Sequence, residues 1–217
     1  MKYENIFFDL DGTLTDSGEG IMNSVQYALK KFGIEERDRE RLRLFIGPPL
    51  IDSFMRYYGF DHDMAVKGVE YYREYFAPKG IYENRPYDGI PEMMQALKDE
   101  GKKLYLATSK PEPYATEIVR HFGLLGFLDG LYGSTMTEER TKKDEVIAYA
   151  LEKTGIDKSE VLMVGDRNHD IIGAKVNGVF SVGVLFGYGS REELTEAGAD
   201  VIVETVNDLR NILSGEK

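Results

Sequence analysis

The chain has 217 residues, with 27 Lys and Arg against 38 Asp and Glu, and its formal net charge is −11. Its hydrophobic fraction of 42% and charged fraction of 30% are ordinary for a globular protein and exclude disorder and low complexity. A surface of this charge repels nucleic acid and anionic membranes, so we expect neither as a partner, and an anionic ligand would need local positive charge at its site. The sequence contains no Cys, which excludes disulfides and thiolate metal sites and fits a reducing compartment.

No targeting segment is visible in the sequence. The first apolar run ends at Phe8 and is followed at once by Asp9 and Asp11, so it is too short for a secretory signal. No apolar run approaches the roughly 20 residues that a membrane span needs. We therefore expect a cytoplasmic protein.

Short apolar runs rich in β-branched and aromatic residues predict strands. Apolar residues follow one another in most of these runs without alternation, which is typical of strands buried on both faces of a parallel sheet. Helical patterns over residues 90–100 and 144–153 lie between the later runs. This order predicts an α/β fold with a doubly wound, mainly parallel, Rossmann-like sheet. The predicted strands are 6–8, 104–107, 161–164, 181–185 and 201–203.

A long helical stretch separates the first predicted strand from the second. Asp16 and Glu19 predict a capping box, after which apolar residues line one helix face until Gly33 ends the helix. Further amphipathic segments cover residues 50–58 and 63–76, and residues 84–89 have the composition of a linker. We predict two domains, an α/β core of residues 1–15 and 85–217 and an inserted α-helical domain of residues 16–84.

Polar residues follow three of the predicted strands. They are Asp9 and Asp11 after the first, Thr108, Ser109 and Lys110 after the second, and Asp166 with Asp170 after the strand at 161–164. Ligands of open α/β sheets bind at the carboxyl ends of the strands. Acidic side chains gathered there would repel one another unless a cation joined them, and oxygen ligands without Cys or His favour Mg²⁺.

The order of these residues resembles the haloacid dehalogenase superfamily, and the resemblance spans nearly the whole chain. The stretch from Phe7 to Leu14 is similar to the first motif and is highly specific. Thr108-Ser109 is similar to the second motif, a Lys near position 143 to the third, and Gly165 to Asp170 to the fourth. The likeness is closest to phosphoglycolate-phosphatase-like members, which implies that the helical insert is a cap domain.

The resemblance implies a role for each acid. Asp9 would be the nucleophile that forms an aspartyl-phosphate, and Asp11 would protonate the leaving oxygen and then deprotonate the attacking water. Related dehalogenases lack the second Asp, so its presence favours phosphate chemistry. Mg²⁺ would be held by Asp9, the backbone carbonyl of Asp11 and Asp166, and Asp170 would be a further ligand or act through water.

The resemblance also implies a phosphate site with its own positive charge. Thr108, Ser109 and Gly12 would bind the phosphoryl oxygens, since Gly12 lets the backbone approach a ligand closely. The third motif lacks the Pro that often follows its Lys, so two lysines are candidates. We choose Lys143 as the catalytic residue, because it lies nearer the predicted helix, with Lys142 as the alternative.

Other residues near the motifs have open interpretations. Arg167 replaces a small hydroxyl residue and either adds positive charge to the site or pairs with a surface acid. His169 is expected to point to solvent or pack locally. Gly47 and Pro48, in a Gly-Pro-Pro loop of the insert, are the candidates for substrate selection. Six tyrosines of the insert form its core or face the active site: Tyr57, Tyr58, Tyr71, Tyr72, Tyr75 and Tyr82.

The sequence thus predicts a Mg²⁺-dependent phosphatase acting on small phosphate monoesters, similar to phosphoglycolate phosphatase. A nucleoside 5′-monophosphate phosphatase (5′-nucleotidase), a pyrophosphatase and a phosphomutase are alternatives on the same scaffold. A regulatory protein without turnover is less consistent with the presence of both Asp9 and Asp11. The expected partner is a small phosphorylated metabolite, and the chain is expected to be a monomer, with a homodimer as the alternative.

Overall fold

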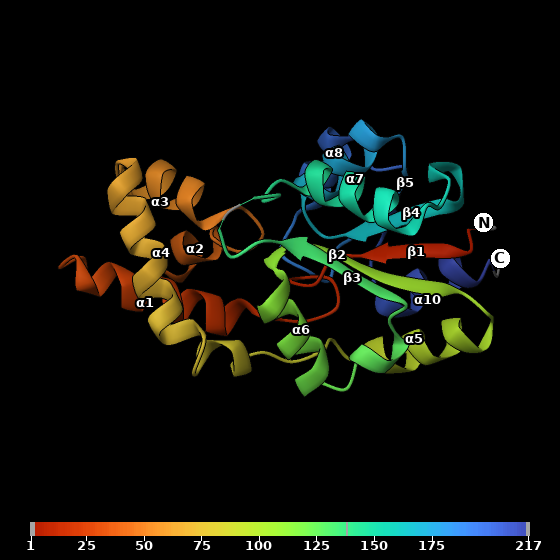
Figure 1. Ribbon diagram of the computed structural model, residues 1–217, viewed down its shortest axis with the longest axis horizontal. Helices are drawn as coiled ribbons and strands as arrows, with labels where there is room; N and C mark the ends of the chain where they lie inside the picture. The colour runs from red at the N-terminus through yellow and green to blue at the C-terminus, as the bar shows by residue number, and fades with distance from the viewer. Residues whose placement is uncertain (1–2, 138, 216–217) are drawn as a thin grey trace. The chain divides into compact units, whose positions relative to one another are not determined.

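The computed structural model describes residues 3–137 and 139–215 (Figure 1). The chain divides into two compact units. The core unit consists of Met1–Thr15 and Pro86–Lys217, and the helical unit of Asp16–Arg85. The helical unit is inserted between the first and second strands of the core unit.

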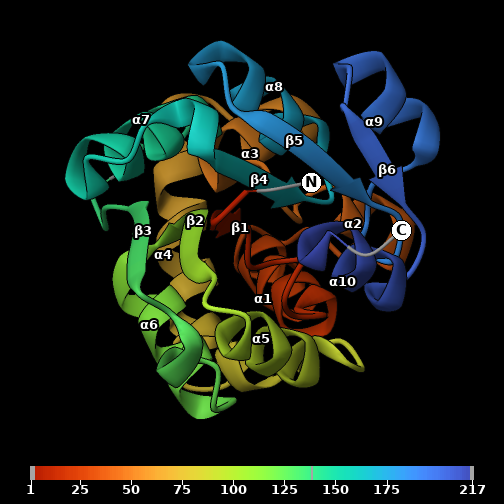
Figure 2. The same cartoon turned by 90° about the vertical axis from the view of Figure 1, so that its right-hand side faces the viewer.

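The core unit is built on one six-stranded sheet of parallel strands in the order β3-β2-β1-β4-β5-β6 (Figure 2). The predicted α/β class with a parallel sheet is therefore confirmed. The strands are β1 (Asn5–Phe8), β2 (Lys103–Pro111), β3 (Gly130–Ser134), β4 (Val161–Gly165), β5 (Phe180–Val184) and β6 (Val201–Val203).

Helices cover both faces of the sheet. On one face lie α5 (Ile90–Asp99), α6 (Glu112–His121) and α10 (Val206–Ser214); on the other lie α7 (Lys143–Thr154), α8 (Asn168–Asn177) and α9 (Arg191–Ala197) (Figure 2). Right-handed crossovers require this arrangement, because the chain steps from β1 to β3 in one direction and then from β4 to β6 in the other. The strand order reverses beside β1, and the carboxyl ends of β1 and β4 therefore flank a topological switch point.

The centre of the core unit explains the continuous apolar runs in the sequence. Every residue of β4 is buried, and in β1 Phe7 lies level with Tyr105 of β2 and Met163 of β4. Phe7 and Met163 belong to a buried cluster that also takes in Val146 and Ile147 of α7. Side chains on both faces of the central strands are thus removed from water, which is the condition under which strands lose polar alternation.

The helical unit has its own apolar interior. Its helices are α1 (Gly18–Lys31), α2 (Arg39–Arg43), α3 (Leu50–Tyr58) and α4 (His62–Phe76), followed by a short 3₁₀ turn at Gly80–Tyr82. Phenylalanine rings pack edge to face within it, with 5.0 Å between the ring centroids of Phe45 and Phe54 and 4.8 Å between those of Phe32 and Phe60. Ring contacts within this unit favour the interpretation that most of its tyrosines pack inside it, whereas Tyr82 is exposed. The tyrosines with such contacts are Tyr57, Tyr58, Tyr71, Tyr72 and Tyr75.

One prediction of local structure is wrong, and one strand was not predicted. The capping box at Asp16 is wrong: α1 has Ser17 at its N-cap without a side-chain cap bond, and the Asp16 carboxylate pairs instead with Arg85 at 3.2 Å. The strand β3 was not predicted. Its sequence, Gly-Leu-Tyr-Gly-Ser, contains two glycines and a single aliphatic residue, so its strand conformation depends on pairing with β2 more than on its own propensity.

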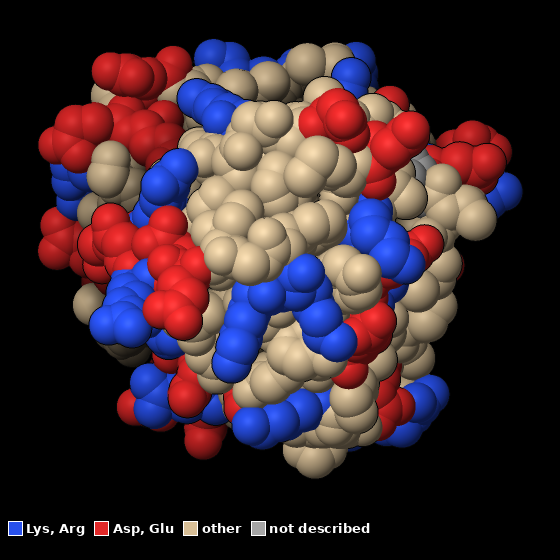
Figure 3. Space-filling model, turned by 90° about the vertical axis from the view of Figure 1, so that its left-hand side faces the viewer, with Lys and Arg blue, Asp and Glu red and all other residues tan. Residues whose placement is uncertain are grey.

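Charged side chains are interspersed on the face of the molecule drawn in Figure 3, where Lys and Arg alternate with Asp and Glu around an area that has neither. Among the residues that the structure describes, this face therefore carries no large continuous patch of Lys and Arg. Within residues 3–137 and 139–215, no helix has both the length and the apolar character that crossing a membrane requires.

Candidate active site

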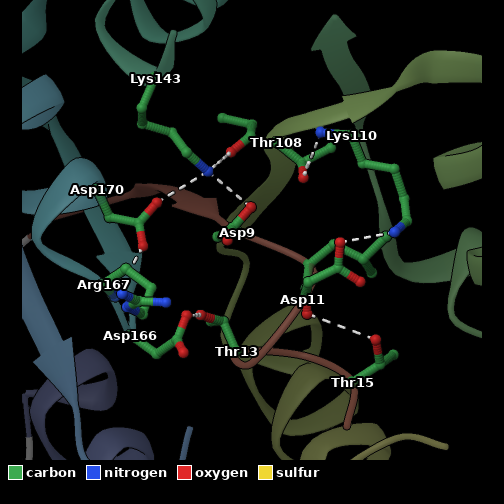
Figure 4. Close-up of polar contacts among 12 residues, drawn as sticks. Asp9, Asp11, Thr13, Thr15, Thr108, Lys110, Lys143, Asp166, Arg167 and Asp170 are labelled. Atoms are coloured by element: carbon green, nitrogen blue, oxygen red, sulfur yellow. Dashed lines mark hydrogen bonds and ion pairs between the residues drawn. The ribbon is translucent and has the colours of Figure 1, made fainter. Parts of the chain in front are cut away.

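Polar side chains that follow β1, β2 and β4 meet at the carboxyl edge of the sheet (Figure 4). β1 ends at Phe8, and the backbone N–H of the next residue, Asp9, donates to the carbonyl oxygen of Val164 in β4 at 3.0 Å. β4 ends at Gly165 and is followed by Asp166. The two aspartates therefore come together because neighbouring parallel strands end at the same level, at the switch point of the sheet.

Lys143 joins this group from the first turn of α7. Its Nζ atom lies 2.6 Å from Oδ1 of Asp9 and 2.8 Å from Oδ1 of Asp170, and it donates to the carbonyl oxygen of Ala107 at 3.1 Å. Lys143 is 5% exposed, whereas Lys142 is the exposed N-cap residue of α7. Of the two candidate lysines, the structure brings Lys143 to the acids.

Burial and mutual repulsion change the acidity of the group. Burial raises the pKa of Asp9 from 3.8 to about 6 although Lys143 lowers it, and burial with the charges of Asp170 and Asp9 raises the pKa of Asp166 well above its usual range. Burial alone would lower the pKa of Lys143, but the carboxylates of Asp170 and Asp9 outweigh it and raise that pKa. The lysine is therefore charged, and the carboxylates are under-compensated.

The three buried acids fit a divalent cation. Carboxylate oxygens of Asp9, Asp166 and Asp170 all lie within 4.8 Å of one another. Lys143 supplies one ammonium group to these three acids, in contact with Asp9 and Asp170. An all-oxygen, buried and under-compensated donor set is the kind that hard cations such as Mg²⁺ take. These residues could therefore hold a metal ion.

Two loops of the core unit hold Asp166 in position. Tyr188 donates its backbone N–H to Oδ2 of Asp166 at 2.8 Å, and Thr13 donates its hydroxyl to Oδ1 at 3.4 Å. A Cβ atom at Gly12 would overlap the Asp166 carboxylate, and one at Gly187 would overlap the Gly12 carbonyl. The sequence predicted only a phosphate-binding role for Gly12. Tyr188 was not predicted at all, although the glycines on either side of it, after β5, indicate a segment whose backbone can approach another group closely.

Asp11 lies apart from the three clustered acids and pairs with Lys110. Oδ2 of Asp11 is 2.7 Å from Nζ of Lys110, and both side chains are almost buried. Thr108 is 2% exposed and lies two residues before Lys110 in β2. Its hydroxyl accepts a hydrogen bond from the backbone N–H of Lys110 at 3.3 Å. Ser109, between these two residues, is half-buried. Lys110 was noted in the sequence as a residue after the second strand but not chosen for the site.

The remaining candidates separate into two groups. Arg167 pairs with Glu193 of α9, with 2.8 Å between Nε and Oε1, so its charge is directed to that acid, and His169 is exposed on the first turn of α8. Gly47 and Pro48 are half-buried in the helical unit between α2 and α3. A role for these two in substrate selection stays a prediction.

The fold and the site define a hydrolase that has a doubly wound α/β sheet and a cluster of buried carboxylates at the switch point of that sheet. A sequence profile of the haloacid dehalogenase-like hydrolases matches residues 6–184, and the chain belongs to this family. Within it the chain is a phosphatase of the haloacid dehalogenase type.

Individual relatives support the same class. The chain is 51% identical over 194 residues to a 5′-nucleotidase of Pseudomonas aeruginosa, covering 89% of this chain and 88% of that protein. It is 27% identical to a phosphoglycolate phosphatase of Vibrio parahaemolyticus over 96% of this chain and 95% of that one. Among solved structures, a predicted phosphatase from Clostridium acetobutylicum superposes with a TM-score of 0.96 at 46% identity, covering 98% and 99% of the two chains.

The raised pKa of Asp9 predicts that the metal-free protein loses stability as the pH rises. Between 3.8 and about 6 the folded state holds more protons than the unfolded state, so the free energy of unfolding falls through this window. At about 1.4 kcal/mol per pKa unit, the contribution is on the order of 2–3 kcal/mol. Urea denaturation with a chelator, from pH 4 to pH 7, is expected to show the wild type losing stability relative to Asp9→Asn. A difference between the two proteins that does not change with pH would contradict the raised pKa.

Proposed function

We propose that the chain is a Mg²⁺-dependent phosphatase that hydrolyses nucleoside 5′-monophosphates through an aspartyl-phosphate on Asp9. The observation that carries the proposal is a buried Asp9 held by Lys143 next to Asp166 and Asp170. Such a group offers a carboxylate nucleophile, a fixed cation and a metal-binding set within a few ångströms. Phosphoryl transfer depends mainly on positioning and electrostatic stabilisation of this kind.

The choice of substrate reverses the order favoured by the sequence analysis, which put phosphoglycolate first. Identity to the 5′-nucleotidase is 51%, against 27% to the phosphoglycolate phosphatase of Vibrio parahaemolyticus. Both matches extend over most of this chain, so the comparison is not limited to the common motifs. The similarity therefore supports the nucleotide alternative over the main prediction.

Asp9 has the state that a nucleophile needs. A pKa of about 6 leaves its carboxylate ionised at neutral pH, and no separate base is required to activate it. Lys143 holds Oδ1, so the second carboxylate oxygen attacks phosphorus as the bond to the nucleoside 5′-oxygen breaks. The ammonium group also offsets negative charge that accumulates between nucleophile and phosphate.

Asp11 exchanges the protons of the two half-reactions. In the first, its carboxyl group gives a proton to the departing 5′-oxygen; in the second, the resulting carboxylate takes a proton from the water that attacks the aspartyl-phosphate. The buried hydroxyl of Thr108 is the candidate donor to the phosphoryl oxygens, together with nearby backbone N–H groups. When bound by Asp9, Asp166 and Asp170, Mg²⁺ would neutralise charge on the phosphoryl group.

The helical unit is proposed to select among phosphate esters, and Gly47 and Pro48 stay the residues predicted to do so. The Gly47 backbone has φ +104°, a conformation that side-chain-bearing residues rarely adopt. The oligomeric state, monomer or homodimer, also stays a prediction.

Phosphate release from a panel of esters tests the proposed activity. The panel contains nucleoside 5′-monophosphates, a nucleoside 3′-monophosphate as the matched control, phosphoglycolate, a sugar phosphate and pyrophosphate, each with Mg²⁺ and with chelator. We expect kcat/KM for a nucleoside 5′-monophosphate to exceed that for phosphoglycolate and the 3′-isomer by about tenfold or more. Chelation is expected to abolish release.

Other results of the panel would change the assignment. Preference for phosphoglycolate or pyrophosphate would replace the proposed substrate and leave the phosphatase class intact. Rearrangement of a sugar phosphate without phosphate release would favour a phosphomutase. Mg²⁺ binding without turnover of any ester would favour a regulatory protein.

The two neighbouring lysines provide a matched test of the site. Lys143→Met is expected to lower kcat by about 10²–10³-fold, because it removes the cation that holds Asp9. Lys142→Met, at the exposed N-cap position next to it, is expected to retain wild-type kcat. Steady-state kinetics at saturating Mg²⁺ measure both effects, with thermal unfolding to verify folding. Equal losses in the two variants would contradict the assignment of Lys143.

A further inference from the structure

Lys110 and Asp11 form a second buried ion pair, separate from the one made by Lys143. The atoms Nζ of Lys110 and Oδ2 of Asp11 are 2.7 Å apart, with side-chain exposures of 7% and 11%. The other carboxylate oxygen, Oδ1 of Asp11, is buried and has no hydrogen-bond partner (Figure 4). The two oxygens of one carboxylate thus have opposite environments.

An unpartnered buried oxygen has to be explained. Leaving a buried acceptor without a donor costs about 1–3 kcal/mol, and native proteins keep few such groups. Removing a lysine from water is also costly, and a buried pair gives little net stability in return. Stability therefore does not account for the arrangement, whereas a role for the free oxygen in the reaction does.

We propose that Lys110 is a positioning residue that makes Oδ1 the proton-exchanging oxygen of Asp11; the inference rests on the proposed function. An ammonium group has donors and no acceptor. While it donates to Oδ2, that oxygen is occupied, and Oδ1 is the oxygen of Asp11 left to meet a reacting group. Lys110 thereby fixes the rotation of the carboxyl group and leaves Oδ1 as the oxygen available for the reaction.

The proton is balanced over the two half-reactions. The O–H bond at Oδ1 breaks and gives its proton to the ester oxygen, as the phosphorus–ester oxygen bond breaks and the bond between phosphorus and Asp9 forms. In the second half-reaction Oδ1 takes a proton from water as the water oxygen bonds to phosphorus and the phosphorus–Asp9 bond breaks. Phosphate leaves, and Asp11 regains its starting protonation.

The backbone of β2 explains how Lys110 reaches Asp11. β2 has nine residues against four in β1, and it continues beyond the level at which β1 ends. Its pairing with β3 shifts register between Ala107 and Pro111. The backbone N–H of Lys110 donates to the hydroxyl of Thr108 at 3.3 Å, which ties the lysine to the proposed phosphate-binding residue.

The leaving group distinguishes this role from direct binding of phosphate. A nucleoside 5′-alkoxide is a poor leaving group and needs a proton, whereas p-nitrophenolate leaves without one. A lysine that acts through Asp11 matters mainly for the first ester. A lysine that binds the transferring phosphoryl group matters equally for both. The parameter kcat/KM isolates the effect, because it covers the steps only up to departure of the leaving group.

The experiment compares kcat/KM for a nucleoside 5′-monophosphate and for p-nitrophenyl phosphate in Lys110→Met. We expect a loss of about 10²-fold for the nucleotide and less than about threefold for p-nitrophenyl phosphate. Asp11→Asn is expected to show the same split, and the double variant no further loss. Lys103→Met, which changes an exposed lysine at the other end of β2, is the matched control and should leave both values unchanged.

Each other outcome has a definite meaning. Equal losses for the two esters, or no loss for either, would overturn the positioning role. If Lys110→Met does not fold, Lys110→Arg, which keeps the cation but changes its reach, must show a smaller loss with the same split between esters. If the wild type hydrolyses p-nitrophenyl phosphate but no nucleotide, the proposed substrate fails, and the comparison is made with phosphoglycolate, also an alkyl ester.

Discussion

The ion pairs of Lys143 are the interaction on which the site depends. Its ammonium group binds Asp9 and Asp170 at 2.6 and 2.8 Å in an environment from which water is nearly excluded. Without it, two carboxylates would be buried next to Asp166 with no opposing charge, an arrangement that costs several kcal/mol. With it, the group is still short of positive charge, so a divalent cation could bind there.

The topology of the sheet brings most of the polar side chains of the site to one edge. Reversal of the strand order beside β1 brings Asp9 and Asp166 to one edge, while the longer β2 carries Thr108 and Lys110 beyond them. Two lysines pair with different acids: Lys143 contacts Asp9 and Asp170, and Lys110 contacts Asp11. Local positive charge of this kind explains how a chain of net charge −11 can accept a phosphate ester.

The sequence predicted the elements whose signals are local. Continuous apolar runs identified the buried strands, and the eight residues from Phe7 to Leu14 identified the first motif, because both depend on neighbouring residues alone. The choice between Lys142 and Lys143 was argued from distance to the helix, and the structure brings Lys143 to Asp9.

Features that depend on distant residues were missed or misjudged. β3 is a strand because β2 pairs with it, and Tyr188 contacts Asp166 only after β5 and its loop have folded. The Asp16 capping box failed because Arg85, far along the chain, offers that carboxylate a competing partner. Lys110 was not chosen because its partner, Asp11, lies after the neighbouring strand β1 and is distant in the sequence, and no local pattern distinguishes Lys110 from a surface lysine.

The central claim is that Asp9 becomes phosphorylated during turnover. The most direct measurement is rapid acid quench of the enzyme with Mg²⁺ and its best phosphate ester, followed by mass spectrometry of the peptides. The account predicts one added phosphoryl group on the peptide that contains Asp9. With p-nitrophenyl phosphate as the donor, more of it is expected in Asp11→Asn, because this ester transfers its phosphoryl group without the Asp11 proton while hydrolysis of the intermediate is slowed. Turnover at a normal rate with no phosphoryl group on that peptide in either protein, or with the group on another residue, would contradict it.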